Sequence, residues 1–232
     1  MYLERLERAL PEVRQRIQRA CDRAGRSDAD AITLVAVTKG HPLEALQAAR
    51  EVGLRVIGEN RVQEAQAKWE AVGHIGLEWQ LVGHLQRNKV RQALKMFTLI
   101  HSVDSLRLAR EIDKEAAKSG RPTAVLVQVN ASGEGSKHGL PAQNALEAVR
   151  AISELQHVRV IGLMTMAPFT EAEAVLRGTF RHTRLLFESC RDSVESFEAR
   201  HLSMGMTNDY EIAVEEGSTM VRLGTVLFGE RR

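Results

Sequence analysis

Eight short runs rich in Val, Ile and Leu recur along this chain, and longer amphipathic stretches separate them. Continuous apolar runs, as opposed to runs that alternate apolar and polar residues, are typical of strands buried on both faces of a sheet. Strands that alternate with helical patterns predict parallel β-α-β units. The expected strands are Thr33–Val37, Arg55–Gly58, Trp79–Val82, Leu99–His101, Ala124–Val129, Val160–Leu163, His201–Met204 and Met220–Leu223.

The number of expected strands favours a closed (β/α)8 barrel, the TIM barrel. The chain has 232 residues, which is at the small end of the size range of this α/β fold. A doubly wound open sheet is the alternative, but no G-x-G-x-x-G motif follows the first expected strand. No Pro-, Gly- or Ser-rich linker interrupts the pattern, so we expect one domain over residues 1–232.

Helical periodicity is present between the expected strands and also before the first one. Leu3, Leu6, Leu10, Val13 and Ile17 recur at helical spacing and predict an amphipathic helix from about Leu3 to Ala24. We expect this extra N-terminal segment, residues 1–25, to pack on the barrel. The other expected helices are Leu43–Val52, Val62–Val72, Ser105–Lys118, Ala142–Leu155 and Glu171–Phe197.

The charge and cysteine content point to a soluble cytoplasmic protein. Lys and Arg exceed Asp and Glu by only 32 − 30 = 2, and no basic stripe is interleaved with aromatics, so nothing supports a nucleic-acid partner. The charged N-terminus has no apolar signal region, and no apolar stretch is long enough to span a bilayer. Cys21 and Cys190 show no disulfide pattern, which suits a reducing compartment.

Lys39 directly follows the first expected strand, and Gly40-His41-Pro42 then breaks the chain. Side chains alternate between the two faces of a strand, so Lys39 shares a face with Val35 and Val37. An amine in this place can form an imine with an aldehyde cofactor. A lysine at a strand end can equally extend its ammonium group to water, so Lys39 by itself leaves both interpretations open.

Two turns that contain glycine and hydroxyl side chains follow the last two expected strands. The first lies within Leu202-Ser203-Met204-Gly205-Met206-Thr207-Asn208-Asp209, and the second ends in Gly224 and Thr225. Phosphate commonly binds between the loops after strands seven and eight of a (β/α)8 barrel, and N–H groups at a helix start favour anions. Ordinary turn chemistry explains either loop alone, but together they predict a phosphate site.

Arg222 would lie among apolar strands, because Met220, Arg222 and Gly224 share one face of the last expected strand. A buried unpaired charge is costly, so the guanidinium needs a partner. The partner is either a strand-end carboxylate such as Glu59 or the ring nitrogen of a bound pyridine. Arginine holds its proton more tightly than a pyridinium does, so the second arrangement would make the ring a poor electron sink. Such a site favours holding a cofactor over decarboxylation or transamination.

Six segments carry a resemblance to a known family: Val35 to Lys39, Ile57 to Glu64, Gly83 to Lys89, Gly162 to Met166, Leu202 to Thr207 and Glu216 to Glu230. In the same order, they resemble the pyridoxal 5′-phosphate homeostasis protein family, whose bacterial members are often called YggS-like and whose mammalian member is called proline synthetase co-transcribed homologue. The resemblance covers essentially the whole chain. It implies a single barrel domain similar to the N-terminal domain of alanine racemase. It also implies that this protein serves intracellular vitamin B6 homeostasis by buffering or delivering pyridoxal 5′-phosphate.

The resemblance also implies roles for single residues. Lys39 would carry pyridoxal 5′-phosphate as an imine, Arg222 would face the ring nitrogen, and Asn60 would lie beside the cofactor. Lys137 is a candidate for a second aldehyde-binding amine, although an exposed loop lysine is usually a solvated charge. Gly40 stands where family members often carry a bulkier residue, which implies a more open entrance. The residues expected around the phosphate are Ser203, Gly205, Gly224 and Thr225.

A carrier and an amino-acid racemase of the alanine racemase type could share this cofactor site. A racemase needs a general base on each face of the substrate, and Lys39 could serve only one. The related racemases take the second base, a tyrosine, from another domain. This chain has only Tyr2 and Tyr210 and shows no second domain, so the sequence favours a monomeric carrier, with apo pyridoxal-phosphate enzymes as candidate partners. His84 is a candidate base or, more simply, a hydrogen-bonded scaffold residue.

Two other classes find less support in the sequence. A barrel hydrolase or aldolase could use Lys39 as a Schiff-base nucleophile and bind phosphate in the two loops, but it leaves Arg222 without a special task. A metal site is not expected, because the eight histidines show none of the usual ligand spacings.

Overall fold

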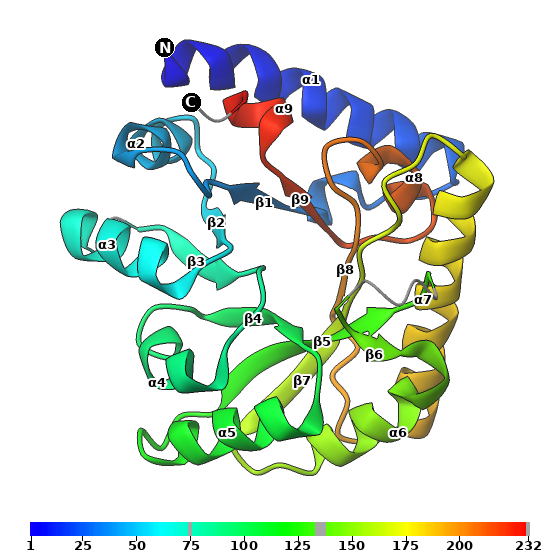
Figure 1. Cartoon of the computed structure of the whole chain (residues 1–232). Helices are drawn as coiled ribbons and strands as arrows, with labels where there is room; N and C mark the ends of the chain where they lie inside the picture. Colours follow the sequence, from blue (N-terminus) through cyan, green and yellow to red (C-terminus); the bar gives the residue numbers. More distant parts are fainter. Residues whose placement is uncertain (74–75, 133–137, 231–232) are drawn as a thin grey trace.

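A closed ring of eight parallel strands forms the centre of the computed structural model, which describes residues 1–73, 76–132 and 138–230 (Figure 1). Neighbours in the ring pair in the order β1-β2-β3-β4-β5-β7-β8-β9, and β9 pairs with β1 to close it. A two-residue strand, β6, adds to β5 outside the ring. The strands are β1 Thr33–Val37, β2 Val56–Glu59, β3 Glu78–Leu81, β4 Leu99–Val103, β5 Thr123–Asn130, β6 Leu140–Pro141, β7 Val158–Met164, β8 His201–Ser203 and β9 Met220–Leu223.

Helices follow the strands and surround the ring, as the alternating pattern of the sequence predicts (Figure 1). Short 3-10 turns at Ala29–Ala31 and Arg87–Lys89 precede β1 and α4. The helices are α1 Tyr2–Arg23, α2 Leu43–Glu51, α3 Val62–Val72, α4 Val90–Ala93, α5 Leu106–Ala117, α6 Ala142–Ser153, α7 Glu173–Ser193, α8 Tyr210–Glu215 and α9 Thr225–Phe228.

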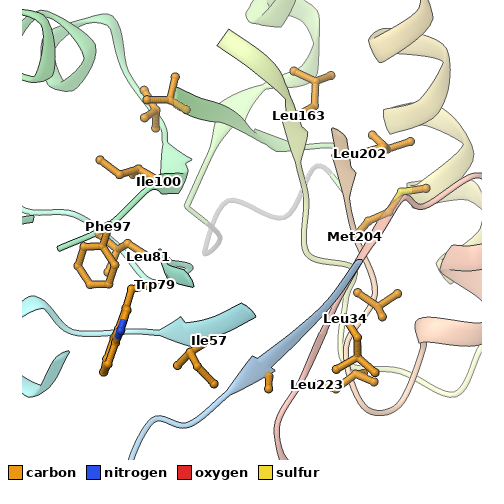
Figure 2. Close-up of a cluster of buried hydrophobic side chains, with 14 of the residues drawn as sticks. Leu34, Ile57, Trp79, Leu81, Phe97, Ile100, Leu163, Leu202, Met204 and Leu223 are labelled. Carbon is orange, nitrogen blue, oxygen red and sulfur yellow. The ribbon is translucent and has the colours of Figure 1, made fainter. Parts of the chain in front are cut away.

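The strands bury apolar side chains on both faces, which explains why they read as continuous apolar runs. One face of each strand points to the surrounding helices and contributes to the larger core. Figure 2 labels ten of its side chains, eight of them on strands β1, β2, β3, β4, β7, β8 and β9, while Phe97 precedes β4 and Met204 follows β8. The other face fills the interior of the barrel with a smaller cluster. The buried members of this inner cluster are Val35, Leu99, Leu126, Ile161, Met164 and Met220.

The N-terminal helix α1 packs on the outside of the barrel against α2, α8 and α9 (Figure 1). Its buried stripe includes Leu6, Leu10, Val13 and Ile17, four of the five residues whose spacing predicted the helix, so this prediction is confirmed. Within the described ranges, no helix is both long and apolar enough to cross a membrane.

All eight expected strands and all six expected helices are present, and their ends differ from the expected ones by a few residues. The largest difference is at the C-terminal end of α7, which stops at Ser193 where a helix to Phe197 was expected. Val194 is already extended, yet Phe197 is buried because its ring packs on that of Phe187, with centroids 5.5 Å apart. Phe197 therefore fits the apolar pattern of the helix in the sequence, but it is buried by packing on Phe187 after the helix has ended. The short elements β6, α4 and α9 were not expected.

Candidate functional site

A cavity of about 1010 Å³ opens at the end of the barrel to which the carboxyl ends of the strands point. This end carries the active site in (β/α)8 enzymes. Loops that follow six different strands, β1, β2, β3, β7, β8 and β9, contribute to its wall. The lining includes Val37, Lys39, Asn60, Val82, Met166, Phe169, Met206, Thr207, Asn208, Asp209, Arg222, Gly224 and Thr225.

Lys39 lies in the wall of this cavity, two residues beyond the end of β1. Val35 belongs to the inner cluster of the barrel, and Val37 lines the cavity together with Lys39. The three side chains therefore follow one face of the chain, in agreement with the strand parity. The amine is partly buried at the boundary between the barrel interior and the cavity.

A buried ion pair lies directly behind the Lys39 segment. The Nζ atom of Lys68, from α3, donates to Glu59 Oε1 and to the carbonyl oxygen of Thr38, both at 2.7 Å. The Thr38 hydroxyl donates to the same carboxylate oxygen at 2.6 Å. Burial raises the pKa of Glu59, while the Lys68 ammonium acts in the opposite direction. Glu59, which the sequence offered as a partner for Arg222, thus pairs with Lys68.

The same network also contacts the chain on the other side of Lys39. Glu64 Oε1 accepts a hydrogen bond from the backbone N–H of Gly40 at 2.5 Å and from Lys68 Nζ at 3.0 Å. Lys68 therefore connects the Thr38 carbonyl group, before Lys39, to the Glu64 carboxylate, which accepts from the Gly40 N–H after Lys39. The backbone of Lys39 is fixed on both sides by side chains of α3.

Arg222, on β9, projects into the barrel interior beside the cavity, opposite Val35 in the strand register. It is only 5% exposed. Nη1 donates to Ser203 Oγ at 2.6 Å and Nη2 to the Thr165 carbonyl oxygen at 2.8 Å, which uses two of its five N–H groups. Burial lowers the pKa of Arg222 to about 10, so the guanidinium stays charged at neutral pH.

A chain of buried hydrogen bonds leads from Arg222 across the barrel. Ser203 Oγ accepts from Arg222, so its single proton is available for His101 Nδ1 at 3.0 Å. His101 Nε2 then donates to Gln80 Oε1 at 2.7 Å, and Gln80 Nε2 donates to Glu78 at 2.8 Å. Burial, aided by the nearby charge of Arg222, holds the pKa of His101 well below its usual range. The imidazole is thus neutral, as this directed chain requires.

The two turns predicted to bind phosphate lie side by side at the cavity, but they present only part of the expected set. Gly224 and Thr225 line it, and Thr207 and Asn208 line it from the first turn. Ser203 and Gly205 are not among the described lining residues. The Ser203 hydroxyl is fully buried against Arg222.

Gly205 packs closely against α8. A Cβ atom there would lie 2.6 Å from the Cβ of Ala213 in α8, and its φ of +93° favours glycine. Gly205 thereby lets the turn that carries Thr207 pack closely on α8. Sequence reasoning missed Thr207, although it is a hydroxyl residue in the same turn.

Asn60 lies in the cavity wall one residue beyond β2, and its Oδ1 atom has no hydrogen-bond partner in the described structure. A buried polar atom without a partner is costly, so a bound ligand would stabilise this place. Together with the Lys39 amine, the Arg222 guanidinium and the hydroxyl-bearing turns, it fits a flat ligand that carries an aldehyde, a ring acceptor and an anionic group.

The two tyrosines do not line the cavity. Tyr210 is 1% exposed, and burial raises its pKa to about 12. The Arg16 guanidinium covers its ring, with the Cζ atom 5.5 Å from the ring centroid. Tyr2 is on the N-terminal helix, and its Oη atom lies 3.2 Å from His41 Nδ1. His84 lies outside the cavity lining and contacts Asp104, with 3.3 Å between Nδ1 and Oδ2. Lys137 falls outside the described residues.

The sequence matches the family described as alanine racemase, N-terminal domain, over residues 9–232. It is 44% identical over 232 residues to the pyridoxal phosphate homeostasis protein of Aquifex aeolicus, across 99% of this chain and 98% of that protein. The structure of PipY from Synechococcus elongatus PCC7942 with PLP bound has a TM-score of 0.81 at 38% identity, across 86% of this chain and 93% of that chain.

The barrel is also similar to that of alanine racemase from Clostridium difficile 630, with a TM-score of 0.76 across 98% of this chain and 57% of that chain. The identity there is 15%, so this likeness shows a shared fold. The order of strands, the N-terminal helix and the match over the full length agree with the expected barrel and family. The chain belongs to the pyridoxal phosphate homeostasis protein family and to the wider family of the alanine racemase N-terminal domain.

Proposed function

We propose that this protein binds pyridoxal 5′-phosphate covalently through Lys39 and serves vitamin B6 homeostasis by buffering the cofactor or delivering it. The observation that carries the proposal is the meeting of the Lys39 amine, the charged Arg222 guanidinium and two hydroxyl-bearing turns in one cavity. The names of the relatives and the PLP bound in the solved PipY structure support it.

The cavity residues divide the proposed ligand between them. Lys39 would meet the aldehyde, and the hydroxyl groups of Thr207 and Thr225, with the backbone at Gly224, would surround the phosphate. Asn60 lies beside the ring. Ser203 acts through Arg222, to which it is hydrogen-bonded, and Gly205 acts by shaping the turn of Thr207.

Arg222 favours storage of the cofactor over catalysis. When bound, pyridoxal phosphate supplies a pyridine ring that can accept electrons, most effectively when its nitrogen is protonated. Arg222, whose pKa of about 10 keeps it charged at neutral pH, donates to that nitrogen without transferring its proton. The residue thus holds the ring in a form that disfavours decarboxylation and transamination.

The lack of a tyrosine in the described cavity wall supports the carrier over the racemase. Tyr210 is buried behind α1, and Tyr2 contacts His41, so neither offers a base opposite Lys39. We propose that apo pyridoxal-phosphate enzymes receive the cofactor, that the carrier acts as a cytoplasmic monomer, and that residues 1–232 form its one domain. The buried free thiols of Cys21 and Cys190 suit a reducing compartment.

A transfer assay tests the proposed function. The protein loaded with pyridoxal phosphate is mixed with an apo-enzyme in the presence of a small-molecule aldehyde trap that removes free cofactor. We expect the apo-enzyme to gain activity faster than it does from an equal amount of free cofactor under the same trap. Equal rates would contradict delivery and leave only buffering.

The racemase alternative is tested separately with alanine in deuterated water. The carrier predicts no turnover of the α-hydrogen of alanine above the rate given by free pyridoxal phosphate. Exchange at ordinary enzymatic rates, lost in the Lys39→Ala variant, would instead establish a racemase.

A further inference from the structure

Three side chains with metal-binding atoms converge beside the mouth of the barrel, from the loops that follow β3, β4 and β5. They are His84, Asp104 and His138, and one ligand atom from each lies within 4.8 Å of the others. In the part of the chain that the structure describes, this is the one place where three such residues meet so closely. We infer that the cluster is a binding site for a divalent transition-metal ion of the zinc type.

The distances suit a common ion. His84 Nδ1 and Asp104 Oδ2 are 3.3 Å apart, and the His84 and His138 rings stack with centroids 4.9 Å apart and an angle of 20° between their planes. Zinc binds imidazole nitrogen and carboxylate oxygen at about 2.0–2.2 Å, so two ligands of a tetrahedral ion are about 3.3 Å apart. The His84–Asp104 pair already has this separation, and a rotation of the His138 ring out of the stack would direct one of its nitrogens at the same ion.

Hydrogen bonds fix the first two ligand positions. The hydroxyl of Ser102, a fully buried residue of β4, donates to the carbonyl oxygen of Gly83 at 2.6 Å and holds the residue before His84. Ser105 Oγ donates to Asp104 Oδ1 at 3.3 Å, which leaves Oδ2 facing His84. A hydrogen bond to a ligating carboxylate, such as that from Ser105, orients the ligand and raises the affinity for the metal.

The third position is fixed in the same way. Gln128 of β5 is 2% exposed, and its Nε2 atom donates to the carbonyl oxygen of His138 at 3.0 Å. Gly139 follows with a φ of +126°, and a Cβ atom there would lie 2.8 Å from the backbone nitrogen of Asn130. The close approach of this glycine to β5 brings His138 back towards the barrel mouth.

The donor set defines the class of ion. Two imidazoles and one carboxylate suit zinc, cobalt, nickel and copper, whereas magnesium and calcium prefer oxygen ligands. Three protein ligands leave a fourth position open to water or another small ligand. The site is accessible, since the His84 side chain is 46% exposed. It lies outside the cavity lining, so the inference does not depend on the proposed cofactor.

A titration of the full chain with zinc tests the inference. The protein is prepared without a polyhistidine tag, treated with a chelator and dialysed, then titrated with Zn²⁺ by calorimetry; bound metal is counted after gel filtration. We expect one zinc ion per chain and a higher Tm with zinc, because an ion that binds only the folded state stabilises it. Cobalt(II) in the same site should give the intense visible absorption of a four-coordinate ion.

Single substitutions identify the ligands. His84→Asn, Asp104→Asn and His138→Asn should each weaken zinc binding by about tenfold or more. None should unfold the protein, because His84 and His138 are exposed and Asp104 is only partly buried; circular dichroism verifies this. His157→Asn is the matched control, because His157 also contacts an aspartate, Asp113, at 3.5 Å. It should bind zinc as the wild type does.

Three results would overturn the inference. The first is the loss of all zinc on gel filtration, and the second is unchanged affinity in the three ligand variants. The third is an equal loss of affinity in His157→Asn, which would show that zinc binds surface histidines without a specific site.

Discussion

At the scale of single residues, hydrogen bonds of buried polar groups hold the Lys39 segment and the Arg222 guanidinium at the cavity. Strand parity placed Lys39 and Arg222 correctly relative to Val35 and Met220, because alternation along a strand is a local property. The partners of these residues could not be predicted. Lys68 meets Thr38, and His101 meets Ser203, only through the pairing of distant strands and helices.

Lys68→Met tests the network behind Lys39. The variant leaves Glu59 buried without its cation, and breaking a buried ion pair from one side costs about 3–5 kcal/mol. We expect this loss in the free energy of unfolding, measured by urea denaturation, and weaker loading at Lys39. Lys118→Met is the control, because Lys118 pairs with Glu115 on the surface and should cost about 0–1 kcal/mol. Equal losses in the two variants would contradict the assigned role of Lys68.

His101 predicts a dependence of stability on pH. Its pKa is lowered in the folded protein, so below its unfolded pKa of about 6.5 the folded state binds fewer protons than the unfolded state. This contribution to stability is present above that pH and is lost as the pH falls. Between about pH 7.5 and about pH 5.5, the wild type should lose up to about 1.4 kcal/mol per pH unit more than His101→Gln.

The control for this pH dependence is His182→Gln, which replaces an exposed histidine of α7. Its stability should follow the pH in parallel with that of the wild type. The same slope in His101→Gln and the wild type would show that His101 does not titrate as the buried hydrogen-bond chain requires.

At the scale of elements, the ring of strands was predictable and the short elements were not. Each long strand carries an apolar run of its own, whereas β6 is set by a two-residue pairing with β5, and α4 and α9 span four residues each. Periodicity needs more turns than these to be visible. The site depends on such pieces, since the turn before α8 carries Thr207 and α9 begins at Thr225.

Gly83→Ala tests how the loop after β3 meets the loop after β2. A Cβ atom at this position would lie 2.3 Å from the carbonyl oxygen of Asn60, so the two loops must separate. We expect a loss of about 1–3 kcal/mol in the free energy of unfolding, measured in urea, and weaker cofactor binding because Asn60 moves. Gly178→Ala in α7 meets nothing within 4 Å and should stabilise the helix by about 0.5–1 kcal/mol. A Gly83→Ala variant as stable as the wild type would contradict this contact.

At the scale of the whole molecule, closure of the barrel brings the ends of the chain together at one site. Pairing of β9 with β1 sets Arg222 beside Val35, so the first and last strands share the cavity wall. The large exposed apolar side chains of the described residues are few: Met1, Phe169, Val175, Leu185 and Met206. Specific interfaces usually need a larger apolar area than scattered residues supply.

This surface predicts a monomer. Sedimentation equilibrium of the full chain should give the mass of one chain, 25.8 kDa, at micromolar concentration. A mass twice as large, independent of dilution, would contradict the proposed monomer and would direct attention to Phe169 and Met206 at the cavity mouth.

Borohydride reduction shows whether Lys39 is the covalent anchor of pyridoxal 5′-phosphate. The protein, loaded with the cofactor, is reduced with borohydride, digested and mapped by mass spectrometry, beside the Lys39→Ala variant and a Lys95→Ala control that changes an exposed lysine. We expect a pyridoxyl group on Lys39 in the wild type and in Lys95→Ala, and none at this site in Lys39→Ala. An unmodified Lys39 peptide from fully loaded protein would contradict it.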